Sequence, residues 1–272
     1  MWPVLFTVFG IPVQSYGTSK ALAAIVAGMI LGRSFQRMGL RKATAHWLVF
    51  WATVWGFVGA KIYFAIDNSI IPGGRGSGAS GFVWYGGLIG GTLAVAVFSH
   101  RHRLRLGSIA GAIAIPLSLA YGIGRVGCFL AGDNTYGRPA DLPWAMAFPN
   151  GTAPVDVPVH PAELYEAAGA FLIAAVLWAL QRRVDAITTF GTYLGLSGLA
   201  RLLVEFIRVN EPALLGLTEA QWLSIASILI GLLMVIVARE RARRTEAAIR
   251  ATVALGFAAQ HPWGPRPGAP PT

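Results

Sequence analysis

Charged side chains are scarce in this sequence of 272 residues. Asp, Glu, Lys and Arg together make up 12% of it, whereas an average soluble domain has about 25%. Negative charge is the scarcer sign, with 12 acidic residues against 22 basic ones, and hydrophobic residues account for 55%. This composition excludes an ordinary soluble domain and predicts an integral membrane protein.

Cysteine is nearly absent as well. The single cysteine, Cys128, excludes an intrachain disulfide and any metal site of the CxxC type. We identify no set of metal ligands and no need for a cofactor, so neither is predicted. The formal net charge of +10 would suit nucleic acid only if the basic residues shared a solvated face, but they lie in short clusters between apolar runs. No nucleic-acid partner is therefore expected.

Long apolar runs are what the sequence has in abundance. A helix needs about 20 predominantly apolar residues to cross a bilayer. Runs near this length occupy residues 16–32, 45–66, 82–98, 106–124, 161–180, 187–207 and 220–238. They predict an all-α integral membrane protein with about seven transmembrane helices. Residues 1–17 do not resemble a cleavable signal peptide, and we expect residues 3–13 to lie along the membrane interface.

The basic clusters predict how the chain is oriented. If the seven runs cross the membrane, four clusters of Lys and Arg all fall on the same side. They are Arg33, Arg37, Arg41 and Lys42; Arg101, Arg103 and Arg105; Arg182 and Arg183; and Arg239, Arg241, Arg243, Arg244 and Arg250. Because loops rich in Lys and Arg remain in the cytoplasm, we predict an N-terminus outside and a C-terminus inside.

A second set of charges lies in or near the outward ends of the predicted spans. The set is Lys61, Arg75, Arg125, Arg138, Arg201, Arg208, Asp133, Asp141, Glu163, Glu166, Glu205 and Glu211. An ionisable group at membrane depth is costly, so it normally faces a cavity and has a partner. Two interpretations stay open: these residues form ion pairs that join helix ends, or they build a binding pocket.

The spacing of the basic residues favours a pocket for an anion. Arg201, Glu205 and Arg208 stand at i, i+4 and i+7, which predicts one helical face. Arg125 and Arg138 bracket a loop that contains glycines, and guanidinium groups recognise phosphate through paired hydrogen bonds. We therefore predict an outward-facing anion pocket, for which an anionic phospholipid headgroup is the nearest phosphate.

The remaining regions complete the predicted organisation. Residues 136–158 contain several prolines that break helices, and we interpret them as a cap that admits a peptide from the side. The membrane domain is expected to cover residues 1–245, with 125–160 as its outward cap and motif loop. Residues 246–272 are predicted to be a cytoplasmic tail, disordered over its Pro- and Gly-rich end.

One stretch carries a specific resemblance to a known family. The segment GRVGCFLAGDNTYGRPADLPWAMAFP, Gly124 to Pro149, resembles the signature of the bacterial prolipoprotein diacylglyceryl transferases. That signature runs approximately G-R-x-G-N-F-x-N-G-E, then a glycine, an R-P pair and D-L-P-W. Four further stretches resemble family segments in the same order. They are GIPVQSYG (Gly10–Gly17), WYGGLIGG (Trp84–Gly91), VHPAELYEA (Val159–Ala167) and GLARLLVEFIRVNEP (Gly198–Pro212).

The resemblance implies a reaction and its partners. The diacylglyceryl group of phosphatidylglycerol would move to the thiol of a lipobox cysteine in a preprolipoprotein, in the bacterial cytoplasmic membrane. Because a thiol with a pKa near 8.5 is mostly protonated at neutral pH, the site should help to deprotonate it. Two alternatives stay open: a related enzyme with another lipid or acceptor, or a non-catalytic protein that binds or transports phospholipids.

The resemblance also assigns candidate residues. The implied catalytic residues are Arg125, Asp133 and Arg201, where guanidinium groups would stabilise the charge that leaves with the phosphate. The implied substrate-binding residues are Tyr16, Gly17, Lys61, Gly86, Gly87, Arg138, Glu205 and Arg208. For the glycines a second interpretation stays open, because small residues also let membrane helices approach closely.

Several positions depart from the family pattern. Tyr85 stands where the family has a histidine, and tyrosine, with a pKa of about 10, is a poor base at neutral pH. Lys61 replaces an arginine, Cys128 an asparagine, and Asp133 a glutamate, with one extra residue before the next glycine. Cys128 is either a nucleophile activated by Arg125 or a small buried side chain.

His160 is the candidate that could replace the missing histidine. We therefore count Tyr85 and His160 among the candidate catalytic residues. The alternative for His160 is a histidine at a helix entry whose side chain forms a hydrogen bond with Asp133 or Glu163. Both interpretations stay open from the sequence.

Overall fold

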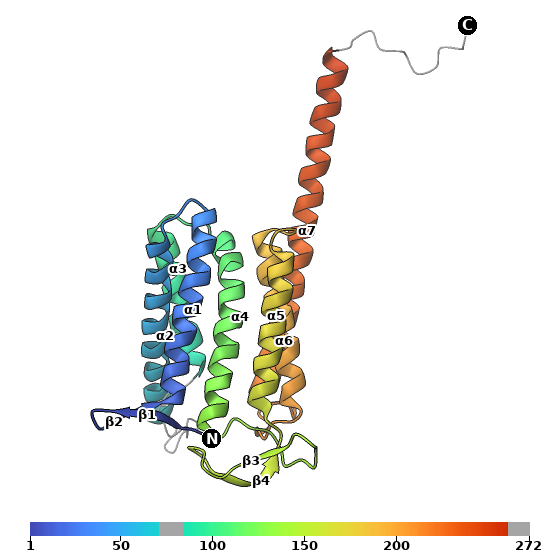
Figure 1. The fold of residues 1–272 in the computed structure, drawn as a ribbon. Coiled ribbons are helices and arrows are strands. Elements are labelled where there is room, and N and C mark those ends of the chain that lie inside the picture. The colour runs from blue at the N-terminus through green and yellow to red at the C-terminus, as the bar shows by residue number, and fades with distance from the viewer. Residues whose placement is uncertain (71–83, 261–272) are drawn as a thin grey trace.

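The apolar runs form helices close to the predicted positions. A computed structural model describes residues 1–70 and 84–260 of the chain; Arg75 and the predicted disordered end at 261–272 lie outside these residues. The described residues form seven helices and four short strands, which Figure 1 shows. In order, these are β1 (Val4–Val8), β2 (Ile11–Gln14), α1 (Ser15–Arg37), α2 (Lys42–Ile70), α3 (Trp84–Arg101), α4 (Leu106–Ala131), β3 (Met146–Phe148), β4 (Val155–Val159), α5 (Ala162–Leu180), α6 (Ala186–Glu205) and α7 (Glu219–Gln260).

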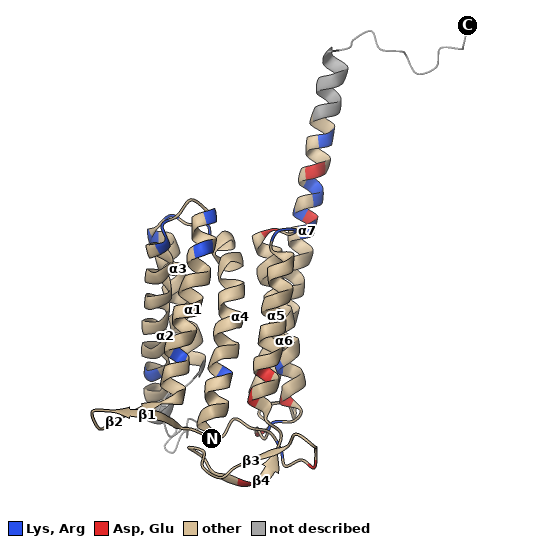
Figure 2. Ribbon diagram, in the orientation of Figure 1, with Lys and Arg blue, Asp and Glu red and all other residues tan. Residues whose placement is uncertain are grey.

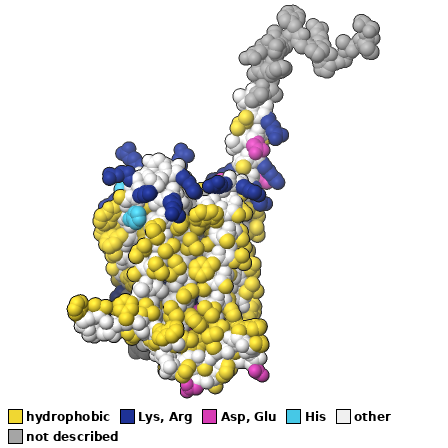
Figure 3. All heavy atoms as spheres, in the orientation of Figure 1, with side chains coloured by type: hydrophobic (Ala, Val, Ile, Leu, Met, Phe, Trp, Pro, Cys, Tyr) yellow, Lys and Arg dark blue, Asp and Glu magenta, His cyan; other side chains and the backbone are white. Residues whose placement is uncertain are grey.

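The helices run side by side as a bundle (Figure 1). Five helices in the described part of the chain are long and apolar enough to cross a membrane: Lys42–Ile66, Leu106–Ala131, Ala162–Leu180, Ala186–Glu205 and Glu219–Thr252. Two helices lie outside this set. The helix α1 is more polar, since it contains Lys20, Arg33 and Arg37, and α3 has only 18 residues. Hydrophobic side chains cover the flank of the bundle between its two ends (Figure 3).

The described residues are mostly helical, as predicted, and four short strands add two antiparallel hairpins that were not predicted. The first pairs β1 with β2 and occupies the segment expected to lie along the membrane interface. Its turn residues, Phe9 and Gly10, have φ angles of 49° and 80°, the left-handed values that suit a two-residue hairpin turn. The strand VLFTV also alternates little between apolar and polar residues, so its periodicity did not identify it.

The end of α4 lies further along the chain than predicted. The helix continues to Ala131 and ends at Gly132, whose φ of 61° is the left-handed conformation that commonly terminates helices. Arg125 therefore lies inside α4, so the prediction of a loop from residue 125 is wrong for the first seven residues, 125–131. The apolar sequence after Arg125 explains this, because a single charge does not interrupt a helix.

The last helix also extends beyond its predicted end. The apolar run ends at residue 238, but α7 continues without interruption to Gln260 and projects beyond the bundle (Figure 1). The domain boundary predicted at residue 245 falls within this helix. The four predicted basic clusters lie at the same end of the bundle or on this projection, as Figure 2 shows.

Glycines bring α2 and α3 into close contact. A methyl group at Gly86 would overlap the backbone carbonyl oxygen of Gly59, and one at Gly90 would overlap that of Trp55. Gly87 faces Gly56 in the same interface, where a Cβ would lie 3.4 Å from the carbonyl oxygen. The structural interpretation of these glycines, close approach of membrane helices, is confirmed.

Candidate active site

Three arginines from different parts of the chain converge on Glu166, in the second turn of α5. Arg125 Nε lies 2.7 Å from Glu166 Oε2, and Arg201 Nη1 lies 2.8 Å from Oε1. Arg208 Nη1 is 3.6 Å from Oε2. We call Arg125, Arg201, Arg208, Glu166 and Glu205 the arginine cluster; its members come from α4, α5, α6 and the turn after α6.

Glu205 is the second carboxylate of the arginine cluster. It pairs with Arg201 Nη2 at 2.8 Å, one helical turn away. Its other oxygen accepts hydrogen bonds from Asn210 Nδ2 at 2.6 Å and Thr218 Oγ1 at 2.7 Å. The end of α6 is thereby connected to the segment that leads into α7.

Burial distinguishes the acids from the bases in this cluster. The side chains of Glu166 and Glu205 are 2% and 0% exposed, whereas those of Arg125 and Arg201 are 17% and 26% exposed. Three guanidinium groups face two carboxylates, which leaves an excess of one positive charge. The buried glutamates therefore orient the arginines, whose accessible edges can bind an anion.

The interpretation of these charges as ion pairs that join helix ends is confirmed, and the interpretation as an anion pocket stays a prediction. Arg125 and Arg201 form ion pairs that join helices, and they also meet at one place, as an anion pocket requires. The prediction that Arg208 continues the helical face of Arg201 is wrong, because α6 ends at Glu205. Arg208 reaches the cluster from the following turn, where its backbone pairs with Gly137.

Glu166 is the site residue to which the sequence patterns assign no role. It is a charge at the outward end of a predicted span and the last acidic residue of VHPAELYEA. The available signal was the excess of basic residues in neighbouring spans, because a charge at membrane depth needs a partner.

Arg208 is the least satisfied member of the cluster. Its side chain is 11% exposed, and its Nε and Nη1 atoms are buried without a hydrogen-bond partner. Burial and the nearby charges of Arg201 and Arg125 lower the pKa of its guanidinium, against the opposing effect of Glu166. Because arginine stays protonated in proteins, these N–H groups remain available as donors.

Asp133 and Glu163 form a smaller acidic group just beyond α4. The Thr135 hydroxyl lies 2.6 Å from Asp133 Oδ1 and 3.1 Å from Glu163 Oε1. A hydroxyl donates one proton at a time, so Thr135 serves one of these carboxylates at any moment. Asp133, the acidic residue of the signature, is thereby held next to the end of α4.

His160 does not have the partners predicted for it. The expected hydrogen bond to Asp133 or Glu163 is wrong: His160 Nδ1 lies 3.4 Å from the hydroxyl of Tyr165, which accepts a hydrogen bond from Trp144 at 2.7 Å. The cause is the backbone, because His160 precedes α5 and pairs with Arg138 and Gly137. These bonds fix its position before the helix begins.

Tyr85, in the first turn of α3, contacts the last helix. Its hydroxyl donates a hydrogen bond to Glu219 Oε2 at 2.9 Å. Glu219 is the first residue of α7, so this bond connects α3 to α7. A phenol hydroxyl can accept a hydrogen bond as well as donate one.

The other candidate residues are distributed over several elements. Tyr16 is 43% exposed, with Lys20 Nζ 4.9 Å from its ring centroid, and the space beside Gly17 is open. Lys61 Nζ lies 5.7 Å from the ring centroid of Phe64. The side chain of Arg138 is exposed and forms no ion pair with any described residue, so the structure does not bring it into the arginine cluster.

Cys128 is buried in α4, with 5% of its surface exposed. Its burial agrees with the interpretation as a small core side chain. Within residues 1–70 and 84–260, no group of three or more His, Cys, Asp or Glu side chains could hold a metal ion.

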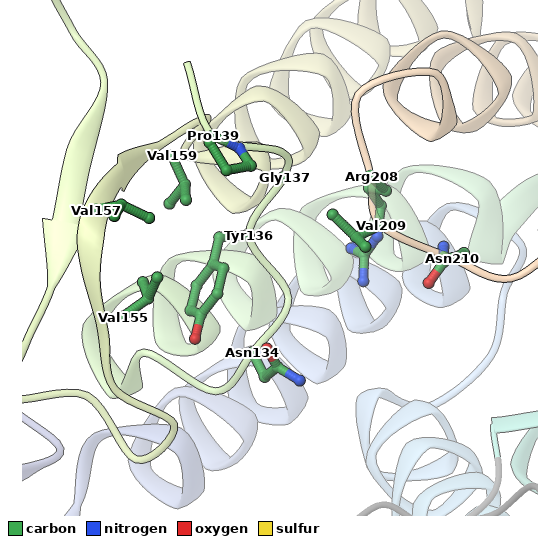
Figure 4. Close-up of a pocket in the computed structure, with 10 residues that line it drawn as sticks. All are labelled: Asn134, Tyr136, Gly137, Pro139, Val155, Val157, Val159, Arg208, Val209 and Asn210. Atoms are coloured by element: carbon green, nitrogen blue, oxygen red, sulfur yellow. The ribbon is translucent and has the colours of Figure 1, made fainter. Parts of the chain in front are cut away.

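A cavity of about 280 Å³ adjoins the arginine cluster at the end of the bundle that carries β3 and β4 (Figure 4). Arg208 belongs to both, because it contacts Glu166 and also lines the cavity. The cavity lining is Asn134, Tyr136, Gly137, Pro139, Val155, Val157, Val159, Arg208, Val209 and Asn210.

Comparison with known proteins identifies the family. The family model described as prolipoprotein diacylglyceryl transferase matches residues 3–237. Similar proteins named phosphatidylglycerol–prolipoprotein diacylglyceryl transferase come from Clostridium tetani (30% identical, covering 85% of this chain and 96% of the relative) and Idiomarina loihiensis (30%, covering 88% and 94%). One from Nitrobacter winogradskyi is 38% identical over 60% of this chain and 58% of its own. The chain therefore belongs to the prolipoprotein diacylglyceryl transferase family of integral membrane proteins.

Proposed function

We propose that this chain transfers the diacylglyceryl group of phosphatidylglycerol to a cysteine thiol of a preprolipoprotein and releases glycerol phosphate. The relatives carry this activity in their names. The thiol sulfur bonds to the terminal glycerol carbon of the diacylglyceryl group, and the bond from that carbon to the phosphate oxygen breaks. The thiol proton passes to a base, and the phosphate leaves with the electron pair.

The observation that carries this proposal is the convergence of three arginines on buried glutamates. The accessible edges of Arg125 and Arg201 offer donors to a phosphate, and the excess positive charge favours an anion. As the ester bond breaks, negative charge accumulates on the leaving phosphate. Donors that are already oriented stabilise this charge without reorganisation, which lowers the barrier.

For the proton, we propose Tyr85 together with Glu219 as the acceptor. The hydrogen bond between them lets the tyrosine oxygen take a proton from the thiol as its own proton moves to Glu219. Asp133 and His160 stay in the proposal as further catalytic candidates, as does a substrate-binding role for Tyr16, Gly17, Lys61, Gly86, Gly87 and Arg138.

We further propose that all seven helices cross the bacterial cytoplasmic membrane. The basic clusters gather at one end of the bundle, and the rule for loop charge assigns that end to the cytoplasm (Figure 2). The arginine cluster and the hairpin of β3 and β4 then face outward. Residues 1–245 would form the membrane domain, with residues 125–160 contributing the end of α4 and the outward cap.

The test is transfer by the purified protein from labelled phosphatidylglycerol to a synthetic cysteine peptide, followed by mass spectrometry. We expect a peptide that carries the diacylglyceryl group. Arg125→Ala should lower kcat/KM by about 100-fold or more, because it removes a donor to the leaving group. Arg243→Ala, a change at a position 76% exposed on the projecting part of α7, is the matched control and should leave the rate unchanged.

Failure of transfer would contradict the proposal if the Clostridium tetani relative is active under the same conditions. If the purified protein then still retains phosphatidylglycerol, the result would support a protein that binds phospholipid but does not catalyse this reaction. Transfer from another lipid, or to another acceptor, would support a related enzyme.

A further inference from the structure

Lys20, on α1, is a positive charge near the site that the arginine cluster does not include. It lies about 7.5 Å along the helix from the first residue, Ser15. Its side chain is exposed, and no carboxylate of the described residues lies within ion-pair distance of it. A charge at this depth in a membrane span normally has a partner or faces a cavity, so the ammonium group needs an explanation.

The ammonium group of Lys20 lies at the face of α4 that carries Arg125. Four residues of α4 share this face because they stand at i, i+3, i+4 and i+7: Tyr121, Gly124, Arg125 and Cys128. A Cβ atom at Gly124 would lie only 3.1 Å from Lys20 Nζ. Glycine at this position therefore leaves room for the ammonium group, one residue before Arg125.

The surroundings of Lys20 leave its charge available to a ligand. A lysine that snorkels to the headgroup layer keeps its ammonium group in water, whereas here Nζ lies beside Gly124 of the neighbouring helix. The charged and titratable groups around it come from α1, α4 and the segment after α4: Tyr16, Arg125, Cys128 and Asp133. The one carboxylate among them, Asp133, has the Thr135 hydroxyl at 2.6 Å.

The proposed reaction changes the charge that this region has to bind. The phosphodiester of the donor lipid carries one negative charge, whereas a phosphate monoester such as glycerol phosphate carries about 1.5 to 2 at pH 7. The arginine cluster has an excess of one positive charge, which matches the diester. The additional negative charge appears only as the ester bond breaks, so a group that binds it acts on the transition state.

We infer that Lys20 is a catalytic residue that binds the phosphate as it leaves and pairs with its second negative charge. This inference rests on the proposed function. The thiol sulfur bonds to the glycerol carbon, the bond from that carbon to the phosphate oxygen breaks, and this oxygen keeps the electron pair. Lys20 keeps its proton and stabilises the resulting charge beside Arg125. Because the interaction strengthens during the reaction, it raises kcat and leaves the affinity for the lipid nearly unchanged.

The first test is the kinetics of transfer from phosphatidylglycerol to a cysteine peptide. Lys20→Gln should lower kcat about tenfold or more, while KM for the lipid changes by less than about twofold. Lys20→Arg keeps the positive charge and should keep most of the rate. The matched control is Lys42→Gln, because Lys42 begins α2 at the other end of α1 and should be neutral.

The second test measures binding and does not depend on turnover. Calorimetry with the purified protein compares two soluble anions: glycerol phosphate, a monoester, and glycerophosphoglycerol, the diester headgroup of phosphatidylglycerol. Lys20→Gln should weaken the binding of glycerol phosphate about tenfold more than that of the diester, because only the monoester carries the second charge.

Three results would each overturn the inference: an unchanged kcat in Lys20→Gln, an effect confined to KM, or equal weakening of the two anions. If the chain transfers no diacylglyceryl group but Lys20→Gln still weakens glycerol phosphate selectively, the proposed function fails and the site for the phosphate dianion stands. If transfer proceeds and Lys20→Gln behaves like Lys42→Gln in every measurement, the proposed function stands and the inference is wrong.

Discussion

Glu166 shares its single carboxylate among three guanidinium groups, so its removal should disorganise the whole arginine cluster. In Glu166→Gln, Arg125, Arg201 and Arg208 would repel one another with Glu205 as the remaining carboxylate. Breaking a buried ion pair costs about 3–5 kcal/mol. We expect a lower unfolding temperature in detergent and at least a tenfold loss of kcat/KM for diacylglyceryl transfer.

A matched control for this change is Glu240→Gln. Glu240 pairs with Arg243 at 3.3 Å, but it is 52% exposed on α7, and exposed pairs contribute about 0–1 kcal/mol. Its removal should alter neither the unfolding temperature nor the transfer rate. If Glu166→Gln transferred the diacylglyceryl group at the wild-type rate, the arginines would hold their positions without this carboxylate.

At the scale of residues, the sequence predicted the bases of the site better than its acids. The sequence singled out Arg125, Arg201 and Glu205 because a charge inside an apolar span is costly and normally has a partner or a function. The excess of basic residues indicates that Glu166 needs a partner, but which arginines it pairs with depends on the packing of α4, α5 and α6, and Arg201 reaches it across 35 residues of sequence. The partner of His160 was missed because backbone pairing with Arg138 and Gly137 sets its position.

The start of α6 offers a prediction at the scale of elements. Asp185 caps this helix by accepting hydrogen bonds from the backbone N–H groups of Ile187 and Thr188. Burial alone would raise the pKa of Asp185, but these bonds and the Thr188 hydroxyl lower it below its ordinary value of 3.8. At neutral pH we expect Asp185→Ala to cost about 0.5–2 kcal/mol of unfolding free energy.

The pH dependence of this cost has a definite sign. Because the folded pKa of Asp185 is lowered, the stabilisation is fully present above pH 3.8 and is lost as the pH falls through the folded pKa. Unfolding measured at a series of pH values from 7 downward should show the wild type and Asp185→Ala converging below pH 3.8. A difference that stays constant over this range would contradict a role for the carboxylate charge.

The contact between α2 and α3 gives a second prediction for elements. Alanine usually stabilises a helix interior by about 1 kcal/mol relative to glycine. At Gly86 we expect the opposite, because its new methyl group would overlap the backbone of Gly59 and push α2 and α3 apart. Gly195→Ala in α6 is the control, since nothing lies within 4 Å of its Cβ position. Unfolding temperatures should fall for Gly86→Ala and hold or rise for Gly195→Ala.

The helices were predictable because each apolar run approaches the length of a membrane span. The predictions that were wrong concern the ends of the helices and the strands. The apolar run alone does not predict that α4 extends to Ala131, because the charge of Arg125 resembles the end of an apolar helix. The strand β4 was missed because three valines that alternate with Asp156 and Pro158 form too short a pattern to separate from a loop.

For the whole molecule, the proposed orientation predicts which side of the membrane is accessible. In a Cys128→Ala background, Asp156→Cys on β4 should react with a membrane-impermeant maleimide in intact cells. Ala242→Cys, on the projecting part of α7, should react only after the membrane is permeabilised. The reverse pattern would invert the proposed topology and separate the arginine cluster from an external acceptor.

The gathering of basic residues at one end of the bundle was predictable, because each cluster followed from counting the intervening spans (Figure 2). The assembly of one site from separate helices was not. Residues 125, 166, 201 and 208 meet only because the segment 132–161, which holds β3 and β4, and the short loop 181–185 return α5 and α6 to the side of α4, and that packing depends on small residues spread along the chain.

The length of α7 has a mechanical consequence. Its 42 residues, at about 1.5 Å each, extend roughly 63 Å, about twice the thickness of a bilayer's hydrocarbon core. With one end anchored in the bundle, the other half works as a rigid spacer. Anything fused to the C-terminus of this chain, such as a reporter or an affinity handle, would therefore stand clear of the lipid headgroups.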